Sequence, residues 1–385
     1  MSVVSFLQDL IRIESLPKQE SKIAARVLIE FRNLGFDEAW KDQAGNVFGL
    51  VRGTEAGVGW MLLTHLDQVD VGDHAQWQHP PFAGVLEEGV IHGRGAVDIK
   101  GPLAAQTYAI AGLLEKRQRP KRNVILCVPV EEETGGWGIA QVVAHLPLET
   151  PQHEKLELGA CIVGEPSSNR VMLGHRGVCR CTVSFHGRAH HASLALKDQN
   201  PHYQLAQFLM RLEQLELPSH PILGRSSLCP TVIRADTISD NLSPNRIDLT
   251  LDWRTTTETA DDVRQILTTL TRGLKASFSS FEDWESQPEG MKTPGFYTEP
   301  NQPDVLALQK TLLEFQPDAP APGVWNFATD GRYLHHAGIP CVGFGPGDQN
   351  LAHTTKEQIQ VNELELHICV LEKFLLENVP SQNAH

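Results

Sequence analysis

The chain has 385 residues, of which 41% are apolar, and this length and composition predict two domains rather than one core. Its 33 basic and 47 acidic residues give a formal net charge of −14, which argues against nucleic acid or an anionic membrane as the main partner. No stretch is apolar over the length of a membrane span, and Asp9 and Arg12 interrupt the apolar pattern at the start, so we expect no signal peptide. Seven scattered cysteines without a CxxC motif indicate reduced thiols and a cytoplasmic protein.

Apolar, β-rich runs alternate with helical patterns through the first part of the chain. Strands are expected at 46–53, 59–65, 123–130 and 159–165, and a helix at 101–117. This alternation predicts an α/β fold with a mostly parallel sheet and helices on both faces.

The pattern changes after His175. The order becomes strand, helix, strand, strand, helix and strand, with the last strand at 281–287, which predicts an inserted α+β sandwich domain at 176–290. Helical and strand patterns then return. We therefore expect residues 291–385 to complete the domain that residues 1–175 begin.

Side chains that can bind metals follow the strands of the first domain. The carboxyl ends of parallel strands lie along one edge of a sheet, so these side chains should converge. Two histidines and three carboxylates exceed the three protein ligands of one catalytic zinc and suffice for two ions that share a carboxylate. Each residue alone has a structural explanation, such as a helix N-cap for the aspartate before the helix at 101–117. The candidate ligands are His65, Asp98, Glu133, Glu165 and His353.

These motifs resemble those of the M20 metallopeptidases, which include acetylornithine deacetylase, succinyl-diaminopimelate desuccinylase, aminoacylase and glutamate-releasing carboxypeptidases. The likeness covers nearly the whole chain. The similar segments are THLDQVDVG, WQHPPFAGVLEEGVIHGRGAVDIKG, VEEETGG, VGEPSS and GFGPGDQNLAHTTKEQI.

The resemblance implies two divalent metal ions, with zinc expected and cobalt or manganese as alternatives. It assigns His65 and Glu165 to one ion and Glu133 and His353 to the other, with Asp98 bridging both.

Two further residues of the same blocks receive roles from the resemblance. Glu132 is the general base, and Asp67 orients the imidazole of His65. Glu131 occupies a position that the family fills with Asp or Glu.

The inserted domain resembles the family's lid and dimerisation domain, which implies a homodimer. HGRAHHAS places a catalytic histidine at His191 rather than His190, and NLSPNRIDLTLDWR places substrate-binding residues at Asn241 and Arg254. One departure is that Asn200 precedes a proline where the family continues differently, which predicts an altered lid loop.

ATDGRYL is close to a Ser-Asp-Gly-Arg run of the desuccinylases and makes Arg332 a candidate for the substrate carboxylate. Structural alternatives remain, because Arg254 can pair with Asp252 and Arg332 with Asp330.

Together these features predict a cytoplasmic, zinc-dependent amidohydrolase that uses activated water to remove an acyl group from an N-acyl amino acid. The substrate is expected to be a small molecule with a free carboxylate. The Gly-Pro-Gly before the last histidine favours an acetylornithine deacetylase-like enzyme, whereas TDGRYL favours a desuccinylase. A dipeptidase or carboxypeptidase is an alternative, and an inactive ligand-binding relative is a remote one.

Overall fold

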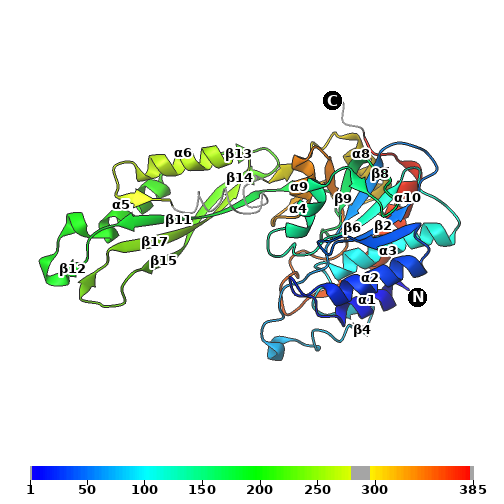
Figure 1. Ribbon diagram of the computed structural model, residues 1–385, viewed down its shortest axis with the longest axis horizontal. Coiled ribbons are helices and arrows are strands. Elements are labelled where there is room, and N and C mark those ends of the chain that lie inside the picture. The colour runs from blue at the N-terminus through cyan, green and yellow to red at the C-terminus, as the bar shows by residue number, and fades with distance from the viewer. Residues whose placement is uncertain (1, 279–294, 382–385) are drawn as a thin grey trace. The chain divides into compact units, whose positions relative to one another are not determined.

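A computed structural model describes residues 2–278 and 295–381, so the strand expected at 281–287 lies outside the described residues. The chain divides into two compact units (Figure 1). Unit 1 comprises Met1–Gly174, Phe296–Trp325 and Thr329–His385, and unit 2 comprises His175–Gly295 and Asn326–Ala328. None of the helices in the described part of the chain combines the length and the apolar character that crossing a membrane requires.

Unit 1 is built on a sheet whose centre is parallel and whose flanks are antiparallel. The parallel strands follow the order β6, β3, β9, β21, and β2 and β10 run antiparallel on either side. The fold is therefore α/β, as predicted, although only the centre of the sheet is parallel. In sheet order, the strands are β1 (Glu38–Lys41), β2 (Val47–Val51), β6 (Val124–Val128), β3 (Gly59–Leu63), β9 (Leu158–Val163), β21 (Cys341–Gly343), β10 (Met172–His175) and β19 (Phe296–Tyr297), with β20 (Gly323–Trp325) paired to β10.

Helices cover both faces of this sheet. Every residue of β3 and β6 is buried, as expected of apolar strands between two helical layers. On one face, alternate strand residues such as Trp60 and Leu62 pack with a first helical layer in one apolar cluster. In a second helical layer, α4 and α9 contact each other, and α9 packs on β9 and β21. The first layer contains α1 (Val3–Ile11), α2 (Ser21–Asn33), α3 (Lys100–Glu115), α8 (Pro303–Phe315) and α10 (Val361–Glu377), and the second contains α4 (Trp137–Ala144) and α9 (Gly331–His336).

A small antiparallel sheet also belongs to unit 1. It has the order β22 (Gln358–Gln360), β5 (Val90–His92) and β4 (Val85–Glu87). Its middle strand leads directly into the segment that carries Asp98, so the sheet anchors that segment.

Unit 2 is an antiparallel sheet with two helices packed on it. The sheet order is β15, β17, β11, β18, and α5 packs on β11 and β17. Asn200 caps α5 by accepting a hydrogen bond from the His202 N–H, and Pro201 occupies the first helical position, where its missing N–H costs nothing. The elements are β11 (Gly177–His186), α5 (Pro201–Glu213), β15 (Ser227–Ala235), β17 (Arg246–Thr255), α6 (Ala260–Thr271) and β18 (Ala276–Ser277).

Candidate metal centre

Five side chains form two overlapping triads in unit 1. The ligand atoms of His65, Asp98 and Glu165 lie within 4.8 Å of one another, and so do those of Asp98, Glu133 and His353. Asp98 Oδ1 lies 3.3 Å from His65 Nε2, and Asp98 Oδ2 lies 3.2 Å from His353 Nε2. The two oxygens of one carboxylate therefore face different triads, which is the arrangement that a bridging ligand requires.

Parallel strand ends place the first triad. β3 and β9 are neighbours, with Leu63 in register with Val163 at their ends. His65 and Glu165 each lie two residues beyond these ends, and His65 Nε2 is 3.6 Å from Glu165 Oε1. Both side chains are buried. Equal offsets on adjacent parallel strands thus bring the two side chains together.

The three consecutive glutamates after β6 point to different surroundings. Glu131 adopts a left-handed φ of 57°, and its carboxylate lies 3.9 Å from Lys18 Nζ. Glu133 belongs to the second triad, with Oε1 3.0 Å from Nε2 of the half-exposed His353. Glu132 is in neither triad. The turn separates charges that are adjacent in sequence.

Asp67 connects the first triad to this turn. Its Oδ1 lies 3.3 Å from His65 Nδ1 and accepts a hydrogen bond from the Glu132 N–H at 3.1 Å. Its Oδ2 accepts one from the Glu133 N–H at 3.0 Å. The fully buried carboxylate therefore lies beside the His65 ring, whose Nδ1 is also 3.1 Å from the Asp67 main-chain carbonyl, and it fixes the backbone of the acidic turn.

Glu357 supports Asp98 and was not anticipated from the sequence. Its Oε1 accepts hydrogen bonds from the N–H groups of Val97 and Asp98 at 2.9 and 3.0 Å. Its Oε2 accepts one from Arg94 Nη1 at 2.6 Å, and both side chains of this ion pair are buried. The segment that carries the shared carboxylate is thereby held in place.

Crowding of carboxylates dominates the electrostatics of the site. Burial, together with the charge of Asp98, raises the pKa of Glu165 well above its ordinary value, and burial with the charge of Asp330 does the same for Glu132. Hydrogen bonds to Asp98 and Glu133 raise the pKa of His353 to about 10. Burial opposes protonation of His65, but hydrogen bonds with Asp67 and Asp98 outweigh it and raise its pKa.

These donors fit divalent cations. Asp98 Oδ1 is buried and faces the His65 imidazole at 3.3 Å, and the neighbouring carboxylates repel one another. A mixture of imidazole and carboxylate ligands suits zinc, cobalt or manganese. Each triad offers three ligands, as catalytic sites of this kind do, and the partly buried Glu132 belongs to neither triad.

Arg332 and Asp330 lie beside the acidic turn. The Arg332 guanidinium donates from Nη2 to the Gly135 carbonyl at 3.4 Å and lies over the Tyr333 ring, while its Nε has no hydrogen-bond partner among the described residues. Within residues 2–278 and 295–381, both Asp330 oxygens are buried without hydrogen-bond partners, and burial raises the pKa of Asp330 to about 7. Asp330 was not expected at the site, although its charge acts on Glu132 more than any other carboxylate does.

The three remaining candidates belong to unit 2. His191 lies in β12 (His190–His191), which pairs with β16 (Leu242–Ser243), and the Ala192 N–H donates to the Asn241 carbonyl at 2.9 Å. His191 and Asn241 are therefore neighbours. Arg254 Nε donates to Asp252 Oδ1 at 2.7 Å, which is the structural alternative considered for this arginine.

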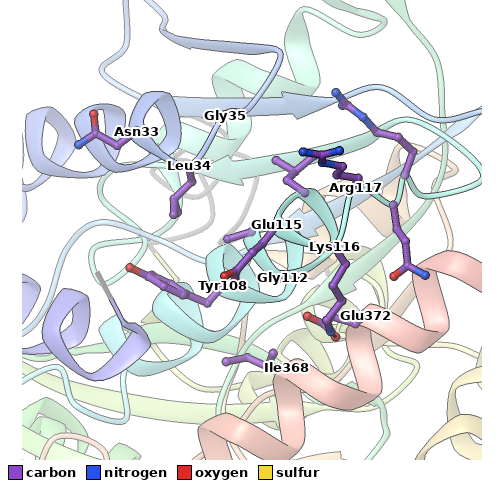
Figure 2. A pocket seen from close by; sticks show the side chains of 14 residues that line it. Asn33, Leu34, Gly35, Tyr108, Gly112, Glu115, Lys116, Arg117, Ile368 and Glu372 are labelled. Carbon is purple, nitrogen blue, oxygen red and sulfur yellow. Dashed lines mark hydrogen bonds and ion pairs between the residues drawn. The ribbon is translucent and has the colours of Figure 1, made fainter.

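A cavity of about 830 Å³ lies away from the triads, at the C-terminal ends of α2 and α3 and beside α10 (Figure 2). Lys116 in its lining pairs with Glu372, and Arg119 pairs with Asp37 at 2.6 Å. None of the candidate ligands lines it. Lys116 and Arg119 are thus already paired with acids, and the cavity is separate from the metal centre.

Comparison with known proteins places these features in context. The model of peptidase family M20/M25/M40 matches residues 61–377. A succinyl-diaminopimelate desuccinylase of Alkalilimnicola ehrlichii is 29% identical over 348 residues, covering 87% of this chain and 88% of that protein. The enzyme of the same name from a Sulfurovum species is 26% identical over 376 residues, covering 95% and 96%.

Solved structures share the fold. The M20 family metallo-carboxypeptidase Sso-CP2 from Sulfolobus solfataricus has a TM-score of 0.75 at 17% identity, covering 97% of this chain and 98% of that one. A tripeptidase from Staphylococcus aureus has a TM-score of 0.74 at 17% identity, covering 97% and 96%.

Proposed function

Because the chain belongs to peptidase family M20/M25/M40, whose members are hydrolases of amide and peptide bonds, we propose that it removes an acyl group from an N-acyl amino acid. The observation that supports this most is the shared carboxylate of Asp98, whose two oxygens face two separate triads. We assign His65 and Glu165 to one divalent ion and Glu133 and His353 to the other, with zinc expected. Bound there, the ions would polarise the scissile carbonyl and lower the pKa of a water molecule.

Glu132 is the proton carrier in this proposal. It is a partly buried acid next to the ligand Glu133 and a member of neither triad, so its carboxylate is not needed as a ligand. It takes a proton from water and passes it to the departing amine. Burial and the charge of Asp330 raise its pKa, which helps Glu132 to retain the proton between the two transfers.

Arg332 is proposed to bind the substrate carboxylate. Its Nη2 donates to Gly135, on the turn that carries Glu132, and its Nε has no hydrogen-bond partner in the part of the chain that the structure describes. A guanidinium with unused donors binds a carboxylate in a bidentate manner. Arg254 and Asn241 are proposed as further substrate contacts, although Arg254 already pairs with Asp252.

The acyl group is proposed to be succinyl. Two relatives that match most of the chain are named succinyl-diaminopimelate desuccinylases, and TDGRYL carries the arginine run of that group. An N-acetyl substrate, as in acetylornithine deacetylase, is the second candidate and rests on the Gly-Pro-Gly before the last histidine. Dipeptides form a third class.

A homodimer is proposed through unit 2. Among the described strands, β15 lies at an edge of its sheet, and Val232 and Ile233 on it are exposed by 40% and 57%. An unpaired edge strand with exposed apolar residues is a suitable surface for a second copy. His191 would then serve the centre of the other subunit.

A substrate panel tests the proposed function. The protein, loaded with zinc, cobalt or manganese, is assayed with N-succinyl-diaminopimelate, N-acetylornithine and a set of dipeptides. We expect the highest kcat/KM for the succinyl compound and no turnover after chelation. Bound metal without turnover of any compound would favour a ligand-binding relative, and preference for dipeptides would favour a peptidase.

A further inference from the structure

Unit 1 contains a second kind of cluster, formed by His79, Glu87 and His92, which shares no residue with the triads. One ligand atom from each lies within 4.8 Å of the others. His79 Nε2 is 3.4 Å from Glu87 Oε2, and the centroids of the two imidazole rings are 4.5 Å apart. Two imidazoles and a carboxylate therefore converge on one point.

The hairpin of β4 and β5 sets two of these positions. Val85 pairs with His92, and Glu87 pairs with Val90. Paired residues of antiparallel strands share a face, as do residues two apart on one strand, so Glu87 and His92 are diagonal neighbours on the same face. His92 is on the middle strand of the small sheet, because β5 also pairs with β22.

His79 reaches this face from a preceding segment that is held in place. The indole N–H of Trp77 donates to the Val71 carbonyl at 2.9 Å, and the Arg94 guanidinium lies 5.0 Å from the Trp77 ring centroid. Arg94 is itself fixed by its buried ion pair with Glu357. The third side chain of the cluster is therefore positioned by contacts that do not involve the cluster.

The imidazoles are not satisfied by the rest of the protein. His79 Nε2 is buried without a hydrogen-bond partner in the described part of the chain. Among the described residues, the imidazole of His92 makes no side-chain hydrogen bond, and its ring lies 4.5 Å from that of His79. A neutral imidazole with a free nitrogen is the form that binds metals.

We propose that His79, Glu87 and His92 bind one divalent transition-metal ion of the zinc class, separate from the two-triad centre. In tetrahedral zinc sites, bonds of about 2.0 to 2.2 Å place ligand atoms about 3.4 Å apart, which is the separation of His79 Nε2 and Glu87 Oε2. Two imidazoles disfavour calcium and magnesium, which take oxygen ligands. Water fills the fourth position, since both histidines line a cavity of about 470 Å³.

The role of this ion is structural. It joins the segment before β4 to both strands of the hairpin, and β5 continues through Gly93 and Arg94 towards Asp98. None of the three ligands touches the triads or Glu132 among the described contacts. Their loss should therefore reduce stability and metal content and leave kcat unchanged.

Metal content after zinc loading and dialysis tests the site. Wild type should retain about one zinc per chain more than Glu87→Gln and His92→Phe. Glu88→Gln is a matched control, because Glu88 adjoins Glu87 but is not in the cluster, and His74→Ala controls for an exposed histidine. Equal zinc content in wild type and both cluster variants would overturn the proposal. The test compares zinc per chain between wild type and variants that all contain the same two-triad centre. Its outcome therefore does not depend on what that centre binds or hydrolyses.

A second measurement does not depend on variants. Anomalous diffraction at the zinc edge from zinc-loaded wild-type crystals should give a peak between His79, Glu87 and His92. Peaks at the triads alone would reject the site. Glu87 is exposed by 58%, so Glu87→Gln is expected to fold normally, and unchanged kcat in this variant separates the site from catalysis.

Discussion

Asp67 and Glu132 are joined by a hydrogen bond of 3.1 Å from the Glu132 N–H to Asp67 Oδ1. The same carboxylate group lies 3.3 Å from His65 Nδ1 and accepts the Glu133 N–H at 3.0 Å. One buried side chain thus positions a proposed ligand, the proposed base and a second ligand. Its negative charge joins two segments of the site that are far apart in sequence, one carrying His65 and the other carrying Glu132 and Glu133.

Asp67→Asn should weaken both metal binding and turnover, each by about 10-fold to 100-fold, as expected when a group that orients a metal-binding histidine is altered. The amide has one acceptor oxygen, so one of the two backbone N–H groups loses its partner. Zinc affinity and kcat measured on the same preparations check this. Asp70→Asn changes an exposed aspartate nearby and should leave both values unchanged; equal behaviour of the two variants would contradict the positioning role.

Glu132→Gln should retain both metals and lose nearly all turnover, because it removes the proton carrier and keeps every proposed ligand. Glu133→Gln should lose metal instead. Metal-to-protein ratios and kcat on the best substrate distinguish the two variants. Activity of Glu132→Gln within a few-fold of wild type, on the order of 1 kcal/mol in the barrier, would mean that the base has been assigned wrongly.

Asp98→Ala should lower metal content more than His65→Ala or His353→Ala. The two Asp98 oxygens face different triads, whereas each histidine faces one. The measurement is metal per chain after exhaustive dialysis. Loss of the same single equivalent in all three variants would rule out the bridging role.

His191→Ala should lower kcat with metal content unchanged, if this histidine donates a hydrogen bond to the oxyanion in the partner subunit's site. Loss of such a donor costs about 2.7 to 4 kcal/mol in the barrier, roughly a hundredfold or more in rate. His190→Ala is the matched control and should have little effect.

Mixing inactive His191→Ala with inactive Glu132→Gln tests the arrangement between subunits. Mixed dimers would contain one site with both residues intact, so partial activity should return. If the mixture remains inactive although subunit exchange has been demonstrated, His191 does not act in the site of the partner subunit.

His367 should make the free energy of unfolding fall in acid. Burial lowers its pKa from 6.5 to about 3. Between these values the unfolded chain binds more protons, so this contribution to stability is complete above about pH 6.5 and is lost as pH falls, by about 2 kcal/mol between pH 7 and pH 5. Urea unfolding at both pH values should show a loss in His367→Gln that is smaller by this amount. His74→Gln should follow wild type, and parallel losses in all three proteins would show that His367 is not buried in its neutral form.

Much of the catalytic unit could be predicted from local pattern. β3 and β9 are apolar runs followed by a histidine and a glutamate at equal offsets, and parallel pairing follows from the helices between them. The direction of β2 could not be predicted, because a buried strand has the same continuous apolar sequence whether it is parallel or antiparallel to its neighbours. β4 and β5 have three residues each, which is too short for a visible alternation.

The supporting residues of the site could not be predicted because their partners are distant in sequence. Glu357 lies in a polar loop and supports Asp98, which is 259 residues earlier. Asp330 lies two residues before a proposed substrate arginine, and the sequence suggests that the two form an ion pair. In the described structure, however, its oxygens are buried without hydrogen bonds. Such roles depend on tertiary contacts that have no periodicity.

The position of unit 2 within the chain has a consequence for the order of assembly during synthesis. β21 pairs with β9, Cys341 beside Cys161, and His353 follows β21, so the sheet and the second triad need residues that leave the ribosome after all of unit 2. Contacts so distant in sequence form late, because the intervening chain must first be ordered or looped out. The nascent chain therefore emerges with His65, Asp98, Glu133 and Glu165 but without the histidine that completes their second triad. A ribosome stalled before β21 should display a chain that captures metal incompletely, and the last segment to emerge would convert it into the full centre.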